Sequence, residues 1–274
     1  LFVEMLTGIN FKTMSDEHLM DQSKQNSLNN RIGNYKFICG KGLIGPNSWI
    51  LIIAMSVLLF PGLVLMLIVI PSYESIVALI ILEIVAFIML GINFWSFYDL
   101  STTDPGIIPK TSSEFNKNYA YFVKLKDFED LSTEQKDIKL KYWETWNILR
   151  PPRSFHWANC NAWIEIHDHH CPWIGGCVGM RTHNKFIIFL YLTSFTALFA
   201  SIICVPAIVG KYDMGYTNDD KGRDSNFVIS ITLWIFAGLM FFVLFIFACS
   251  HLYMASKNLT TNENLRKTYK RKPN

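Results

Sequence analysis

The chain has 274 residues, 51% of them hydrophobic and only 17% charged, and its mean hydropathy is +0.23. Soluble domains of this length carry more charge and less aliphatic bulk, so the composition excludes an ordinary water-soluble protein. The formal net charge of +3 is too small to indicate binding to nucleic acid, and we expect no nucleic-acid partner.

Four nearly uncharged segments contain most of the excess hydrophobic residues. They cover residues 48–70, 75–97, 186–209 and 227–253, and each is long enough to cross a bilayer as a helix. Buried helices of a soluble protein are about half as long and keep a polar face, which these segments lack. The sequence therefore predicts an all-α membrane protein with four transmembrane helices in a lipid bilayer.

Outside these segments the chain divides into two tails and one long insertion. We predict a tail over residues 1–47, helices 1 and 2 within 48–98, an insertion over 99–185, helices 3 and 4 within 186–253, and a tail over 254–274. Lys and Arg residues concentrate in the tails and the insertion, which predicts that all three face the cytosol. The first tail is polar and rich in asparagine, as flexible segments are. Because it starts with Leu1, we expect the natural chain to begin earlier.

The second half of the insertion, residues 141–185, has an irregular composition in which Pro, His, Cys and Trp crowd together. This composition is typical of a small module held together by metal, because so short a segment buries little apolar surface. Cytosolic thiols stay reduced, so metal ligation or nucleophilic chemistry is favoured over disulfide bonds for these cysteines.

The stretch "HDHHCPWIGGCVG", residues 167–179, contains one acid, three histidines and two cysteines. Within it, His169 can deprotonate Cys171 while Asp168 holds the imidazole in the required tautomer, which is the arrangement of an activated thiol. The alternative is that these side chains all ligate a metal ion, since spacing alone does not separate the two interpretations.

His170 and Cys177 are better candidates for metal ligands. With His156 and Cys160 upstream, they supply the nitrogen and sulfur donors that zinc prefers. A lone histidine such as His183 or His251 is predicted to be an interface or packing residue.

The stretch "RPPRSFHWANCNAWIEIHDHHCPWIGGCVG", residues 150–179, resembles the cysteine-rich domain of the DHHC protein S-acyltransferases, also called palmitoyltransferases. "TTDPG" (Thr102–Gly106) and "TTNE" (Thr260–Glu263), which follow the second and fourth predicted helices, resemble two further motifs of this family. The four-helix layout is also similar, so the resemblance covers most of the chain apart from the N-terminal tail. It implies that the insertion between helices 2 and 3 is a cytosolic, zinc-binding cysteine-rich domain.

The resemblance also implies a role for each site residue. Cys171 takes the acyl group, His169 acts as its base and Asp168 orients His169. The family binds two zinc ions, and the corresponding positions are Trp143, Trp146, His156 and Trp163 for the first ion, and Trp157, Cys160, His170 and Cys177 for the second. The family has cysteine at the four tryptophan positions, and indole offers no lone pair suited to a metal. Read literally, the first site is lost and the second is an open site with three ligands.

Two interpretations of these tryptophans remain open. In the first, the protein is a catalytically impaired relative that acts as a membrane adaptor. In the second, UGA codons that specify cysteine have been translated as tryptophan, which explains why every lost ligand is a tryptophan while Asp168, His169 and Cys171 are kept. The mass of the peptide spanning Tyr142–Arg150 distinguishes the two interpretations.

The activity implied by the resemblance is transfer of a palmitoyl group from palmitoyl-CoA to protein thiols through an acyl-cysteine intermediate. The partners would be membrane-associated proteins with cytosolic cysteines, and the Golgi, the endoplasmic reticulum and the plasma membrane all fit. Four cations are candidate partners of the CoA phosphates, or equally of anionic lipids: Arg150, Arg153, Arg181 and Lys185. Candidate determinants of acyl-chain length in the third helix are Ser194, Thr196 and Ser201.

Overall fold

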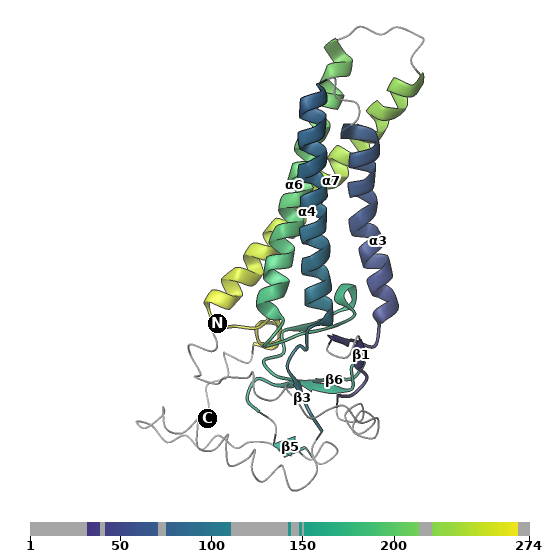
Figure 1. Cartoon of the computed structure of the whole chain (residues 1–274). Coiled ribbons are helices and arrows are strands. Elements are labelled where there is room, and N and C mark those ends of the chain that lie inside the picture. Colours follow the sequence, from purple (N-terminus) through teal and green to yellow (C-terminus); the bar gives the residue numbers. More distant parts are fainter. Residues whose placement is uncertain are drawn as a thin grey trace.

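A computed structural model describes residues 32–38, 42–70, 75–110, 142–143, 148–149, 151–213 and 221–267. The long helices stand on a small domain of short strands (Figure 1). The helices are α3 (Ser48–Val64), which continues as the π-helical η2 (Leu65–Val69), α4 (Ile76–Thr102), α6 (His183–Asp213) and α7 (Lys221–Ser256).

The four predicted membrane helices are confirmed as helices that are long and apolar enough to cross a bilayer. The candidate spans cover Ser48–Val69, Ile76–Thr102, His183–Val209 and Asn226–Ser256, and they fit a multi-pass membrane protein. The second, third and fourth spans extend beyond the predicted limits at the ends next to the small domain. The membrane helices therefore join the small domain without long linkers.

The small domain consists of short antiparallel strands, so the all-α prediction holds for the membrane part only. β3 (Ile107–Ile108), β7 (Ala162–Ile164) and β6 (Phe155–Trp157) form a three-stranded sheet in that order. β8 (His169–Cys171) pairs with β9 (Gly176–Val178) around the 3₁₀ turn η4 (Pro172–Ile174). Strands of two or three residues are too short to show an alternating pattern, which is why the sequence did not reveal them.

Two further strand pairs and one short helix complete the described elements. β1 (Lys36–Ile38) pairs with β2 (Gly42–Ile44), and β4 (Tyr142–Trp143) pairs with β5 (Ile148–Leu149). The short helix α8 (Thr261–Arg266) follows α7 closely and begins inside the "TTNE" motif.

The N-terminal segment before α3 is folded in the part that the structure describes. Ile32, Tyr35 and Leu43 are buried in one cluster with Cys160 and Trp163 of the small domain. The prediction of a flexible tail is therefore wrong from residue 32 onward, because apolar side chains among the polar ones find a core to join. Residues 1–31 lie outside the described residues.

A second buried cluster joins the small domain to the helices. Cys171 and Ile174 pack there against Phe97 and Leu100 of α4 and against Phe186 of α6. Burial of this apolar surface fixes β8 at the membrane-helix ends, so the thiol of Cys171 lies where the small domain meets the bundle.

Candidate active site

Strand β8 separates two chemical functions onto its two faces. His169 and Cys171 lie two residues apart and therefore project on the same side, whereas His170 projects on the other. In the β8–β9 ladder, His170 lies opposite Cys177 and Cys171 lies opposite Gly176. The strand thus directs His169 and Cys171 toward the bundle, and it directs His170 toward the strands of the small domain.

Asp168 is the centre of the first group, and its side chain is almost completely buried. One carboxylate oxygen of Asp168 lies 2.7 Å from Nδ1 of His169. The backbone N–H of Thr261 donates to the carboxylate at 2.6 Å and the Thr261 hydroxyl donates at 2.9 Å. Three donors therefore hold the carboxylate in one orientation.

These contacts shift the pKa values of the Asp168–His169 pair in opposite directions. Burial raises the pKa of Asp168, but hydrogen bonds from His169 and Thr261 outweigh it and hold this pKa well below its ordinary range. Burial lowers the pKa of His169, but hydrogen bonds to Asp168 and to the sulfur of Cys171 raise it to about 9. His169 is thus a strong base supported by an ionised carboxylate.

The "TTNE" motif supports this pair from the far end of the chain. Thr260 caps α8 and forms a reciprocal capping box with Glu263. Both carboxylate oxygens of Glu263 accept from the guanidinium of Arg153, at 2.6 Å and 2.8 Å. Arg153 also donates to the side-chain and backbone oxygens of Asn258, both at 2.9 Å. Arg153 therefore ties α8 to the start of β6.

Two further histidines, both from membrane helices, surround the same carboxylate. His251 of α7 is 3.8 Å from Asp168, and His183 at the start of α6 is 3.9 Å from it. The ring of His169 packs edge-on against Phe186, with centroids 5.0 Å apart, and lies 5.6 Å from the ring of His251. Asp168, His169 and His251 gather closely enough to hold a metal, but the hydrogen bonds of Asp168 favour an orienting role.

An apolar cavity lies among the four membrane helices. Its volume is about 110 Å³. Phe97 packs in the cluster around Cys171 and also lines the cavity, as do Met55, Leu58 and Leu244. The cavity therefore shares part of its wall with the cluster that contains Cys171, and its lining extends along the bundle to Leu65 and Ala86.

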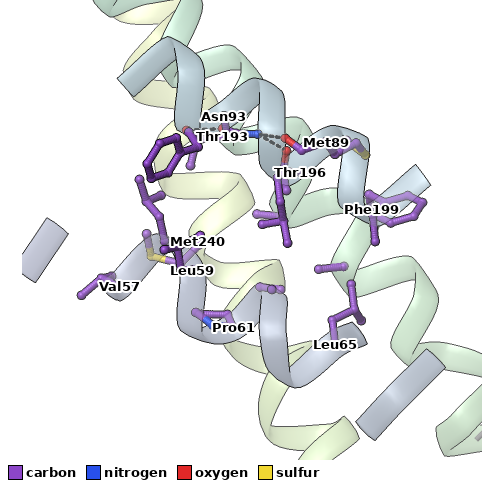
Figure 2. Close-up of a pocket in the computed structure, with 18 of the residues that line it drawn as sticks. Val57, Leu59, Pro61, Leu65, Met89, Asn93, Thr193, Thr196, Phe199 and Met240 are labelled. Atoms are coloured by element: carbon purple, nitrogen blue, oxygen red, sulfur yellow. Dashed lines mark hydrogen bonds between the residues drawn. The ribbon is translucent and has the colours of Figure 1, made fainter. Parts of the chain in front are cut away.

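One polar group interrupts the apolar wall of this cavity. Figure 2 shows Asn93 of α4 meeting Thr193 and Thr196 of α6. The Thr193 hydroxyl donates to Asn93 at 2.9 Å, and the amide of Asn93 donates to the backbone oxygen of Met89 at 3.0 Å. Of the third-helix residues that the sequence suggested, Thr196 lines the cavity, whereas Ser194 and Ser201 do not.

On the other face of β8, three donor atoms converge. Sγ of Cys160 lies 3.4 Å from Nδ1 of His170 and 3.5 Å from Sγ of Cys177, and Cys177 lies 3.6 Å from His170. The Cys177 thiol donates to Cys160 and, against the effect of burial, lowers the pKa of Cys160 to about 5. Two sulfurs and one imidazole nitrogen at these distances are compatible with a zinc ion.

Indole rings take the places expected for further ligands. Trp157 stacks on the ring of His170, with centroids 5.3 Å apart and planes 13° from parallel. Trp163 lies opposite His156 in the β6–β7 ladder, with ring centroids 5.5 Å apart. The residues of the first expected zinc site that the structure describes therefore do not fit a metal ion. Trp146 lies outside the described residues, and only the backbone of Trp143 is described.

The four cations proposed for CoA have different surroundings. Arg181 donates to Asp104 at 2.5 Å, and Lys185 donates to Asp99 at 2.7 Å. Arg153 is bound to Glu263, whereas Arg150 lies outside the described residues. A role for these groups in CoA binding stays a prediction, and for Arg153 it competes with four hydrogen bonds inside the chain.

The sequence does not predict the contributions of Thr261, His183 and His251 to the site. The "TTNE" motif was recognised, but its spacing does not reveal that Thr261 binds Asp168. The sequence predicts a packing or interface role for His251, and its ring does pack against Phe247, with centroids 4.6 Å apart. Its closeness to Asp168 depends on the approach of α7 to the small domain, which no local pattern encodes.

Comparison with known proteins supports the resemblance. The family model described as DHHC palmitoyltransferase matches residues 136–268. "Probable protein S-acyltransferase 2" of Arabidopsis thaliana is 28% identical over 88% of this chain and 62% of its own length. "Palmitoyltransferase ZDHHC9" of Danio rerio is 30% identical over 61% of this chain and 45% of its own length. The chain thus spans less than two thirds of the length of either relative.

Proposed function

Because the chain belongs to the DHHC-type protein S-acyltransferase family, we propose that it transfers a long-chain fatty acyl group from acyl-CoA to cysteine thiols of membrane-associated proteins. The observation that carries this proposal is the grouping of His169 and Cys171 on β8 with Asp168 directly before it, held by Thr261.

The first step loads the enzyme. His169 takes the proton of the Cys171 thiol, and the thiolate attacks the carbonyl carbon of the acyl-CoA thioester. A new carbon–sulfur bond forms to Cys171 while the bond to the CoA sulfur breaks. The proton on His169 passes to the departing CoA thiolate, so the step consumes no other reactant.

The second step repeats this chemistry with a protein substrate. His169 deprotonates the incoming cysteine, whose sulfur attacks the acyl group on Cys171 and releases the enzyme thiol. Each step exchanges one thioester for another, so the contribution of the protein is positioning and proton transfer. The raised pKa of His169, about 9, means that the imidazole holds a proton received from a thiol until the leaving thiolate takes it.

The apolar cavity among the membrane helices, which shares Phe97 with the cluster around Cys171, supports a long apolar acyl chain as the transferred group. Its lining runs along α4 from Phe97 to Ala86, roughly 16 Å of helix axis. Each methylene that leaves water for such a cavity contributes about 0.8 kcal/mol. We expect the acyl chain to lie in this cavity, with the CoA phosphates outside, on the cytosolic side of a Golgi, endoplasmic reticulum or plasma membrane.

Zinc would brace the domain that carries β8. Cys160, His170 and Cys177 are the described residues that would hold it, and a bound zinc ion supplies rigidity rather than chemistry to such a module. His170 neighbours both His169 and Cys171 on the strand, so fixing His170 also fixes the two reacting side chains.

The experiment is covalent labelling of the purified full chain with alkyne-tagged palmitoyl-CoA. We expect a label that hydroxylamine removes, that Cys171→Ala abolishes, and that the control Cys249→Ala retains. No label on the unmodified chain would contradict the proposal and favour a non-catalytic membrane adaptor. A label that survives in Cys171→Ala would contradict the assignment of the nucleophile.

A further inference from the structure

The N-terminal segment lies directly on the metal-binding side of the small domain, and Figure 1 shows β1 beside it. The backbone N–H of Asn34 donates to the carbonyl oxygen of Cys160 at 2.8 Å, and its side chain donates to the carbonyl oxygen of Asn159 at 2.9 Å. The segment therefore binds the loop that carries the metal ligand Cys160.

Tyr35 extends this contact to both sulfur ligands. Its side chain is 5% exposed, and its hydroxyl oxygen accepts the backbone N–H of Cys177 at 3.0 Å. A phenol is protonated at neutral pH, so the hydroxyl of Tyr35 keeps its proton. A phenol that accepts from the backbone and keeps its proton is a donor for a thiolate. Tyr35, Cys160 and Cys177 are buried in one cluster, so the hydroxyl that contacts the backbone of Cys177 lies among the side chains of both cysteines.

Two glycines, Gly33 and Gly45, allow the backbone of the N-terminal segment to approach the small domain closely. Gly33 has φ +71, and a Cβ atom there would lie 2.1 Å from the backbone oxygen of Asn161. A Cβ at Gly45 would lie 2.0 Å from the backbone oxygen of Gly175, in the turn before β9. Neither position can take a larger residue without moving the segment away from the metal ligands.

We infer that Tyr35 is a positioning residue of the metal site, holding the sulfurs of Cys160 and Cys177 in place so that residues before the first membrane helix control metal retention. This inference concerns the metal site and does not depend on acyl transfer. The family match begins at residue 136, so it does not include Tyr35.

The effect follows from the chemistry of metal ligands. Groups that hydrogen-bond to ligands orient them, and their removal typically lowers metal affinity by about 10- to 100-fold. The dependence is strongest where the ligand set is incomplete, and here the described donors are Cys160, His170 and Cys177, with Trp157 against the ring of His170.

The test measures zinc release from the purified, zinc-loaded full chain to a chromogenic chelator. We expect Tyr35→Phe, which removes only the hydroxyl, to release zinc at least about 10-fold faster than the unmodified chain. The matched control is Tyr253→Phe, whose side chain is 65% exposed on α7 and which should release zinc at the unmodified rate. In the cobalt-loaded chain, the thiolate-to-cobalt absorption band should change in Tyr35→Phe and not in Tyr253→Phe.

Equal release from Tyr35→Phe and Tyr253→Phe would overturn the inference, as would a chain that binds no zinc after reloading. If Tyr35→Phe is not recovered folded, Gly33→Ala replaces it, with Gly91→Ala as the control because a Cβ at Gly91 meets nothing within 4 Å. Faster release from Gly33→Ala than from Gly91→Ala supports the inference, and equal release overturns it. If the unmodified chain shows no label on Cys171 but Tyr35→Phe still releases zinc faster than Tyr253→Phe, only the proposed transferase activity is contradicted.

Discussion

The two hairpins of the small domain, β6–β7 and β8–β9, share a backbone arrangement but differ in chemistry. Each places a histidine directly opposite a second residue: His156 faces Trp163 in the first, and His170 faces Cys177 in the second. In β8–β9 the facing pair joins Cys160 to give three donor atoms within 4.8 Å of one another. In β6–β7 the facing pair is an imidazole against an indole.

The comparison shows that the fold of a hairpin does not by itself make a metal site. The indole rings keep the β6–β7 region packed, and Trp163 is 2% exposed in the buried core of the domain. Trp157 fills space beside His170 in the same way, but its buried Nε1 has no hydrogen-bond partner among the residues that the structure describes. Apolar packing thus replaces coordination in one hairpin, whereas the other keeps its polar chemistry.

The largest effect is expected at Asp168, which serves the β8–β9 side alone. Asp168→Asn leaves a neutral amide beside His169 and removes the charge that supports the base. We expect the rate of Cys171 labelling to fall by about 100-fold or more, with the zinc content unchanged. If Asp168→Asn is labelled about as fast as the unmodified chain, the contact between Asp168 and His169 has a structural role only.

Restoring ligands one at a time should affect the two hairpins differently. Trp157→Cys gives the Cys160, His170 and Cys177 group a fourth ligand, so we expect zinc release to slow by about 10-fold or more. Trp163→Cys alone leaves the β6–β7 side with two ligands, and the zinc content measured by elemental analysis should not rise. A second zinc ion in Trp163→Cys would contradict the difference between the hairpins.

The pH dependence of stability should report the charge on His169. Folding raises the pKa of His169 from 6.5 to about 9, so the folded chain binds this proton more tightly than the unfolded chain. The resulting stabilisation is complete below about pH 6.5 and is lost as the pH rises through about 9. We expect the melting-temperature gap between the unmodified chain and His169→Gln to be widest near pH 6 and to narrow toward pH 9.5. A melting-temperature difference that stays constant with pH would contradict the raised pKa of His169.

The smallest effects are expected at the ion pairs around the domain. Arg153 binds both oxygens of the partly buried Glu263, so Arg153→Ala should lower the free energy of unfolding by about 1–3 kcal/mol. Arg181 is 46% exposed and forms an ion pair with Asp104. Arg181→Ala should therefore change the free energy of unfolding by less than about 1 kcal/mol. Melting temperatures measured in detergent test whether Arg153→Ala is the more destabilising variant. An equal fall in the melting temperature of both variants would contradict this prediction.

The sequence predicted the membrane helices well because long apolar runs carry their own signal. It also brought together Asp168, His169 and Cys171, because strand β8 and the residue before it contain all three. It did not predict the support of Asp168 by Thr261, or the contact of Tyr35 with Cys177, which joins residues 142 positions apart. Such contacts depend on how the helices bring distant segments together, and no local pattern records them.

The contact between Thr261 and Asp168 joins two residues 93 positions apart in the chain. During synthesis the ribosome therefore completes the nucleophilic thiol long before it completes the group that holds the orienting carboxylate. We therefore expect the proposed acyl transfer only after the last membrane helix has been inserted and α8 has docked, because a nascent chain that stops short of α8 lacks the Thr261 contacts of Asp168.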